Sequence, residues 1–143
     1  MNINSLKEYL EHIAKFTDGK SVEVVVLKHG QQFSIPEVVR PKWMKRGKKR
    51  QCYANSYRIS TTTSWKYVEG FSVNKHGIPI QHAWVVNNEN VIAETTLEKL
   101  EDEYYGIIID ENYIHKAMIE SGVFGVQDMS NKVFREKYLK HLK

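Results

Sequence analysis

The chain has 143 residues, of which 41% are hydrophobic and 27% are charged, a composition typical of a soluble globular domain. No apolar run approaches the roughly 18 residues of a membrane helix, and the first residues lack the basic and apolar segments of a secretory signal. The single cysteine, Cys52, excludes an internal disulfide and suits a reducing compartment. We therefore expect one domain over residues 1–143, located in the cytoplasm and without membrane contact.

The formal net charge of +4 is unevenly distributed. Seven cations crowd into the segment that precedes the cysteine: Arg40, Lys42, Lys45, Arg46, Lys48, Lys49 and Arg50. Basic clusters of this kind bind phosphate backbones or acidic proteins, although most are solvated loops. Nucleic acid is therefore one candidate partner of this segment.

The first third of the chain predicts a helix, two extended segments and a loop. Ser5 opens a capping box, and apolar residues at helical spacing follow it, which predicts a helix over about 5–17. The β-branched run 22–27 predicts a strand. Residues 32–39 predict a further extended piece, broken by a proline, and the cationic stretch 41–50 predicts an exposed loop.

The middle of the chain predicts a short helix and several strands. A helix of two or three turns begins at Cys52, and the threonine run that follows favours an early end. Residues 65–73 predict a strand, and residues 80–87 and 91–96 predict a hairpin. The acidic stretch 97–103 is compatible with a short helix.

The last third predicts one more strand and two helices. Residues 104–109 return to a strand pattern, and Asp110 can cap a helix over about 111–121 that ends at Gly122. A basic amphipathic helix is expected over about 130–142. The complete order predicts an α+β domain with a central antiparallel sheet and helices at both chain ends.

A thiol, an imidazole and a carboxylate supply the parts of an acyl-transfer site. The thiolate of Cys52 would attack a carbonyl carbon, His82 would take and return the proton, and Glu94 would orient the imidazole. A helix N-terminus at Cys52 would favour the thiolate. Taken singly, each residue has a simpler explanation: a small buried apolar cysteine, a hydrogen-bonded strand histidine and a surface carboxylate. No spacing of ligands indicates a metal site.

The predicted hairpin decides whether Glu94 can serve His82. Side chains alternate along a strand, and a two-residue loop would leave Glu94 on the face opposite to His82. A three-residue loop, 88–90, pairs Trp84 with Glu94 and makes Glu94 a diagonal neighbour of His82. Three-residue loops place their last residue in the left-handed region, which Asn90 tolerates. We therefore predict the three-residue loop, with the Glu94 carboxylate in hydrogen-bond reach of His82.

Four short segments together resemble the transglutaminase-like core of the papain-like cysteine superfamily. They are Cys52-Tyr53-Ala54-Asn55, Tyr67-Val68-Glu69-Gly70-Phe71, Ile78 to Val86 with Gln81-His82-Ala83-Trp84, and Glu94-Thr95-Thr96. The resemblance covers about residues 50–110 and implies a nucleophile at Cys52, a general base and acid at His82 and an orienting carboxylate at Glu94. Here Glu94 takes the place of the family's aspartate.

The resemblance implies a cysteine hydrolase or acyltransferase acting on a protein, a peptide or a small amide or ester, without a cofactor. Trp43 and Gln51 are candidates for an oxyanion donor, but their spacing does not fix that role, and a packing or surface role is favoured for both. The alternative is a non-catalytic binding module of the same fold, in which the segment 40–50 holds nucleic acid or an acidic protein.

Overall fold

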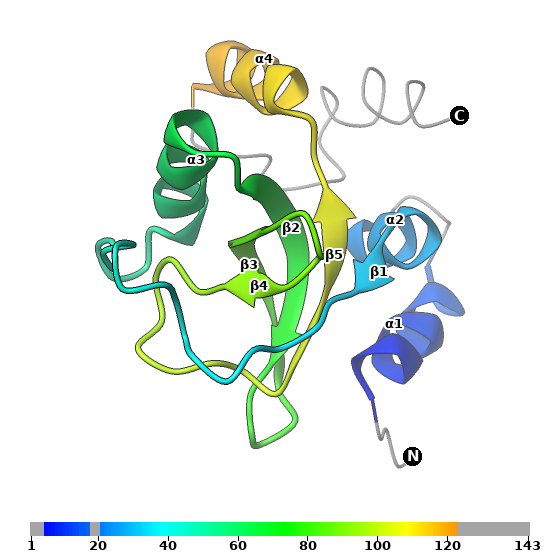
Figure 1. Ribbon diagram of the computed structural model, residues 1–143. Helices are drawn as coiled ribbons and strands as arrows, with labels where there is room; N and C mark the ends of the chain where they lie inside the picture. The colour runs from blue at the N-terminus through cyan, green and yellow to red at the C-terminus, as the bar shows by residue number, and fades with distance from the viewer. Residues whose placement is uncertain (1–4, 18–20, 123–143) are drawn as a thin grey trace.

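A computed structural model describes residues 5–17 and 21–122 of the chain. This part contains four helices and five strands and confirms the predicted α+β class with an antiparallel sheet (Figure 1). The helices are α1 (Leu6–Ala14), α2 (Val22–His29), α3 (Cys52–Thr62) and α4 (Glu111–Ser121). The strands are β1 (Gln31–Gln32), β2 (Lys66–Val73), β3 (Pro79–Val86), β4 (Ile92–Ala93) and β5 (Glu103–Ile108).

The five strands form one sheet in the order β1-β5-β2-β3-β4, with antiparallel pairing between all neighbours. The sheet is curved, and an isolated bridge between Ser34 and Val91 connects its two edges. Two backbone hydrogen bonds accompany this bridge: Ser34 donates to the carbonyl of Asn90 at 3.4 Å, and Ile92 donates to the carbonyl of Ser34 at 3.2 Å. The curvature therefore creates a concave inner face.

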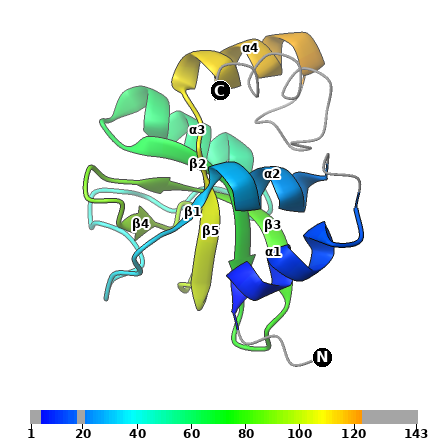
Figure 2. The same cartoon turned by 90° about the vertical axis from the view of Figure 1, so that its right-hand side faces the viewer.

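Side-chain alternation in β2 divides the core between the two faces of the sheet. Tyr67 and Phe71 join the cluster that α1 and α2 cover, whereas Val68 packs with Trp84 and Tyr104 inside the curve. α1 and α2 lie side by side next to β5, and α3 packs against β2 and β3 (Figure 2). Both faces of the central strand are thus buried, and even its polar residues Glu69 and Ser72 are shielded from solvent.

The prediction of a strand over 22–27 is wrong, because this run forms helix α2. The hydroxyl oxygen of Ser21 accepts a hydrogen bond from the backbone N–H of Val24 at 3.2 Å and caps the helix. Val22, Val25 and Val26 are buried, and their spacing is that of one helix face. β-branched residues disfavour a helix only slightly, and packing against α1 and the sheet outweighs that preference.

The hairpin register predicted from the sequence is confirmed. Val86 pairs with Ile92, the backbone N–H of Asn87 donates to the carbonyl of Val91 at 3.1 Å, and the loop consists of residues 88–90. Asn90 adopts φ 60°, in the left-handed region. Extending the register by two residues brings Glu94 opposite Trp84, on the face of the sheet that carries His82.

Other predicted elements are confirmed with changed boundaries. The first helix ends at Ala14, so Phe16 is 75% exposed and not part of a buried face. The strands expected at 65–73 and 104–109 are β2 and β5, and α4 follows the Asp110 cap and ends at Gly122 as expected.

Three expectations differ from the structure or lie outside it. Residues 97–102 form bends instead of the short acidic helix. The extended piece over 32–39 is reduced to β1 and the bridge at Ser34. The expected helix over 130–142 lies outside the described residues. Within residues 5–17 and 21–122, no helix is long and apolar enough to cross a membrane.

Candidate functional site

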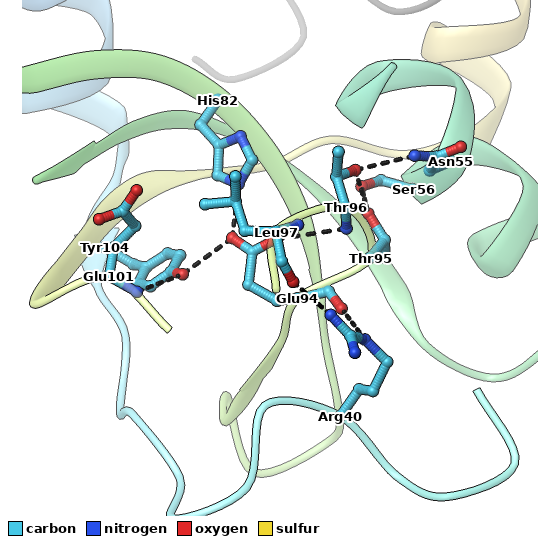
Figure 3. A network of polar contacts seen from close by, with 10 residues as sticks. All are labelled: Arg40, Asn55, Ser56, His82, Glu94, Thr95, Thr96, Leu97, Glu101 and Tyr104. Atoms are coloured by element: carbon cyan, nitrogen blue, oxygen red, sulfur yellow. Dashed lines mark hydrogen bonds and ion pairs between the residues drawn. The ribbon is translucent and has the colours of Figure 1, made fainter. Parts of the chain in front are cut away.

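Glu94 lies at the centre of a buried polar network just after β4. Its side chain is fully buried, and its Oε1 lies 2.5 Å from His82 Nε2 and accepts a hydrogen bond from Tyr104 Oη at 2.8 Å. Its Oε2 accepts from the backbone N–H groups of Leu97 at 3.1 Å and Thr96 at 3.4 Å (Figure 3). Burial alone would raise the pKa of Glu94, but the hydrogen bond and charge of His82 outweigh it and lower the pKa. The carboxylate is therefore ionised.

His82 stands on β3 with only 3% of its surface exposed. Its ring packs near the rings of Trp84 and Tyr104, with centroids 5.9 Å and 6.3 Å away. Burial lowers the pKa of His82, but hydrogen bonds with the side chains of Cys52 and Glu94 outweigh that effect and raise the pKa to about 10. At neutral pH the ring is an imidazolium held between a thiol sulfur and a carboxylate.

Cys52 is a free, half-buried cysteine and the first residue of α3, where it packs against the apolar cluster under α1 and α2. The Cys52 side chain lies close enough to His82 to help raise the pKa of the ring, while Nε2 of that ring is engaged by Glu94. The N-cap residue, Gln51, makes no side-chain hydrogen bond to the first turn.

A second set of hydrogen bonds ties α3 to the segment that carries Glu94. Asn55 donates from Nδ2 to Thr96 Oγ1 and to the carbonyl of Lys48, each at 2.9 Å. The hydroxyl groups of Ser56 and Thr95 lie 2.7 Å apart, and both side chains are buried (Figure 3). These contacts hold the beginning of α3 against the residues that follow Glu94, and so relate the thiol to the carboxylate.

Arg40, the first of the seven cations considered as a nucleic-acid contact, has hydrogen-bond partners within the chain. Its Nε donates to the carbonyl of Glu94 at 2.7 Å, and its Nη2 donates to the carbonyl of Leu97. The backbone N–H of Glu94 in turn donates to the carbonyl of Val39 at 2.9 Å. Arg40 thus holds the backbone on both sides of the Glu94 side chain.

The structure brings the three predicted site residues into one chain of contacts and adds Tyr104, Asn55 and Arg40 around them. Sequence reasoning missed the roles of these three, since a tyrosine in a strand or an asparagine in a helix carries no local mark of its distant partner. Trp43, which was a candidate oxyanion donor, is 56% exposed, and Gln51 is exposed as well.

A surface hollow of about 540 Å³ borders this network. It lies between the β2–β3 turn and residues 97–102, and Leu97 and Glu101 connect it to the surroundings of Glu94 (Figure 3). Burial raises the pKa of Glu101, and the charges of Glu94 and Asp102 add to this effect while that of His82 opposes it. Across the described part of the chain, no group of three His, Cys, Asp or Glu side chains is arranged to hold a metal ion.

Comparison of the chain with known protein families, with curated proteins and with solved structures finds no match. The function therefore has to be argued from the geometry of the site.

Proposed function

We propose that this protein is a cysteine-dependent acyl-transfer enzyme, with Cys52 as nucleophile, His82 as general base and acid, and Glu94 as the group that orients His82. One observation carries the proposal: the His82 ring contacts the Glu94 carboxylate at 2.5 Å, and the side chain of the chain's one cysteine interacts with the same ring and raises its pKa. This is the order of groups that activates a thiol for attack on a carbonyl.

The energetic cost of the arrangement supports a catalytic role. A buried ion pair contributes little net stability compared with apolar residues of the same volume, because both charges lose their hydration. His82 and Glu94 are nonetheless 3% and 0% exposed, and their pKa values move in opposite directions. Perturbed titratable groups beside a nucleophile are typical of active sites.

The proposed reaction follows from the order of these three groups. The thiolate sulfur of Cys52 attacks the carbonyl carbon, and a C–S bond forms as the carbonyl oxygen takes the negative charge. Backbone N–H groups of the first turn of α3 can donate to that oxygen. When the intermediate collapses, the C–N or C–O bond breaks, and His82 gives its proton to the leaving group.

A second half-reaction regenerates the enzyme. Water or an amine attacks the thioester and loses a proton to His82, and the C–S bond breaks to release an acid or a new amide. Glu94 stabilises the imidazolium and fixes its orientation through both half-reactions. The groups needed are all supplied by the chain, so the proposal involves no cofactor.

We extend the proposal to the fold, which we assign to the transglutaminase-like, papain-like type. Support comes from the order of the parts: a helix that begins at Cys52, a strand with His82 and a following segment with Glu94. A half-buried thiol nucleophile also requires a reducing compartment, which favours the cytoplasm.

The proposal is tested with p-nitrophenyl acetate, an activated ester that acylates thiols. We expect a burst of p-nitrophenol, an acetyl group on Cys52 in the intact mass spectrum, and turnover. Cys52→Ala should abolish all three, and His82→Ala should slow acylation by about a hundredfold. Acetylation that is confined to lysines, or that is unchanged in His82→Ala, contradicts the proposal.

A further inference from the structure

The cationic segment left outside the site forms an unneutralised surface. We define the basic loop as Lys42 to Arg50, whose six charged side chains are all exposed: Lys42, Lys45, Arg46, Lys48, Lys49 and Arg50. None of the six forms an ion pair with a described residue, and the sequence contains no Asp or Glu between Glu37 and Glu69. The basic loop therefore has a local positive field with no internal counter-charge.

The basic loop is anchored, unlike an ordinary solvated segment. Met44 is 2% exposed and packs with Val85 and Ala93. The backbone N–H of Gly47 donates to the carbonyl of Thr95 at 2.8 Å, and the carbonyl of Lys48 accepts from Asn55. In Figure 1 the loop passes along the side of α3. Repulsion between like charges would spread the cations apart, but these anchors hold the backbone of the loop in place. The cations are therefore presented in a fixed arrangement.

An aromatic ring stands among these cations. Trp43 directly precedes the buried Met44, but its own side chain is 56% exposed. The chain turns there, since the backbone N–H of Met44 donates to the carbonyl of Pro41 at 3.0 Å. An exposed tryptophan costs hydrophobic free energy, and within the described residues nothing covers this one. It offers a flat apolar surface next to positive charges.

We infer that the basic loop binds single-stranded nucleic acid, with Trp43 stacking on a base and the surrounding cations holding the phosphates. Proteins that bind single strands without sequence preference combine these two features, a cationic track and an exposed aromatic ring. An acidic protein would satisfy the charges but would not require the exposed ring. The inference does not depend on the proposed enzymatic function, because no catalytic residue belongs to the basic loop.

The test is fluorescence anisotropy of a labelled, mixed-sequence single-stranded oligonucleotide of about 20 nucleotides. The Cys52→Ala protein is used, so that the result is separate from any acyl-transfer activity. We expect affinity to fall steeply with salt, because each neutralised phosphate releases counterions. Replacing Lys45, Arg46, Lys48 and Lys49 with Ala should reduce the slope of log K against log salt by about 3.

Two further variants examine the aromatic ring. Trp43→Ala should weaken binding about tenfold without changing the salt slope, and Trp43→Phe should retain most of the affinity. Phe16→Ala removes another exposed aromatic side chain and should have no effect.

A matched control distinguishes the effect of the basic loop on affinity from the effect of net charge. The exposed cations Lys7, Lys15, Lys75 and Lys99 lie elsewhere, and their replacement with Ala removes the same charge. This control should bind like the parent protein. The inference is overturned if the control and the loop variant lose affinity equally, if the Cys52→Ala protein does not bind at low salt, or if poly-glutamate binds equally well and Trp43→Ala has no effect.

Discussion

His82 Nε2 and Glu94 Oε1 lie 2.5 Å apart across the turn from β3 to the segment after β4. The hairpin register puts both side chains on the inner face of the sheet, and the glutamate arm spans the diagonal between them. The hydroxyl group of Tyr104 and the backbone N–H of Leu97 donate further hydrogen bonds to the carboxylate oxygens. The length of the glutamate side chain thus suits the distance that it has to cover.

The first prediction concerns the reactivity of Cys52. The pKa of His82 is about 10, so its ring is charged at neutral pH, and a positive charge beside a thiol promotes its reaction with electrophiles. His82→Ala should slow alkylation by iodoacetamide at pH 7 by about tenfold, measured by intact mass against time. His76→Ala, which changes an exposed histidine, should leave the rate unchanged. Equal rates in all three proteins would show that His82 does not act on the thiol.

The second prediction concerns stability and pH. Folding raises the pKa of His82 from 6.5 to about 10, so this contribution is full below pH 6.5 and is lost as the pH rises through 10. Folding lowers the pKa of Glu94 from 4.5, so its contribution is present above pH 4.5 and is lost on acidification. The contribution of this pair to the free energy of unfolding should therefore be largest near pH 4.5–6.5.

Glu94→Gln tests this window by urea denaturation at several pH values. At about pH 5.5 the variant should lose about 3 kcal/mol, because an unpaired buried charge remains on His82. The difference in unfolding free energy between the wild type and Glu94→Gln should shrink towards pH 10, because His82 loses its proton there. Glu98→Gln, at an exposed position, should track the wild type. A constant difference at all pH values would contradict the linkage.

The third prediction concerns Tyr104, which shares Glu94 Oε1 with His82. Tyr104→Phe keeps the ring but removes the Oη donor, and also the acceptor of the Glu101 backbone N–H. Because the lost bond has a charged acceptor, we expect a loss of about 2 kcal/mol in unfolding free energy. Tyr105→Phe, whose hydroxyl bonds weakly at 3.5 Å, is the control and should cost less.

The fourth prediction distinguishes Arg40 from its cationic neighbours. Arg40→Ala leaves the carbonyl groups of Glu94 and Leu97 without their donor, which should lower the unfolding free energy by about 2 kcal/mol. Lys42→Ala removes the same charge from an exposed position and should change it by less than about 0.5 kcal/mol. Similar values for both variants would mean that these hydrogen bonds are not needed for stability.

The fifth prediction concerns Asn90, whose φ of 60° sets the three-residue loop. Asn90→Gly should leave the unfolding free energy nearly unchanged, since glycine adopts this conformation without strain. Asn90→Val should cost about 1–2 kcal/mol, because a β-branched residue resists the left-handed region. Glu89→Val, at the neighbouring loop position, controls for the added apolar side chain. Urea denaturation measures all three, and equal losses for Glu89→Val and Asn90→Val would refute the role of backbone strain.

The sequence by itself determined those features that depend on neighbours along the chain. The capped helices α1 and α4, the strands β2, β3 and β5 and the register of the β3–β4 hairpin follow from periodicity, capping residues and a loop of fixed length. Glu94 and His82 are only twelve positions apart and are joined by this one hairpin, so their proximity could be predicted from the sequence.

Tertiary structure alone decided the features that join distant segments. The valine run 22–26 fits a strand by propensity and a helix by spacing, and packing against α1 and the sheet selects the helix. Arg40 looks like its cationic neighbours until the fold brings the carbonyl groups of Glu94 and Leu97 to its guanidinium. Buried polar groups must find partners wherever the fold puts them, and those partners leave no periodic trace in the sequence.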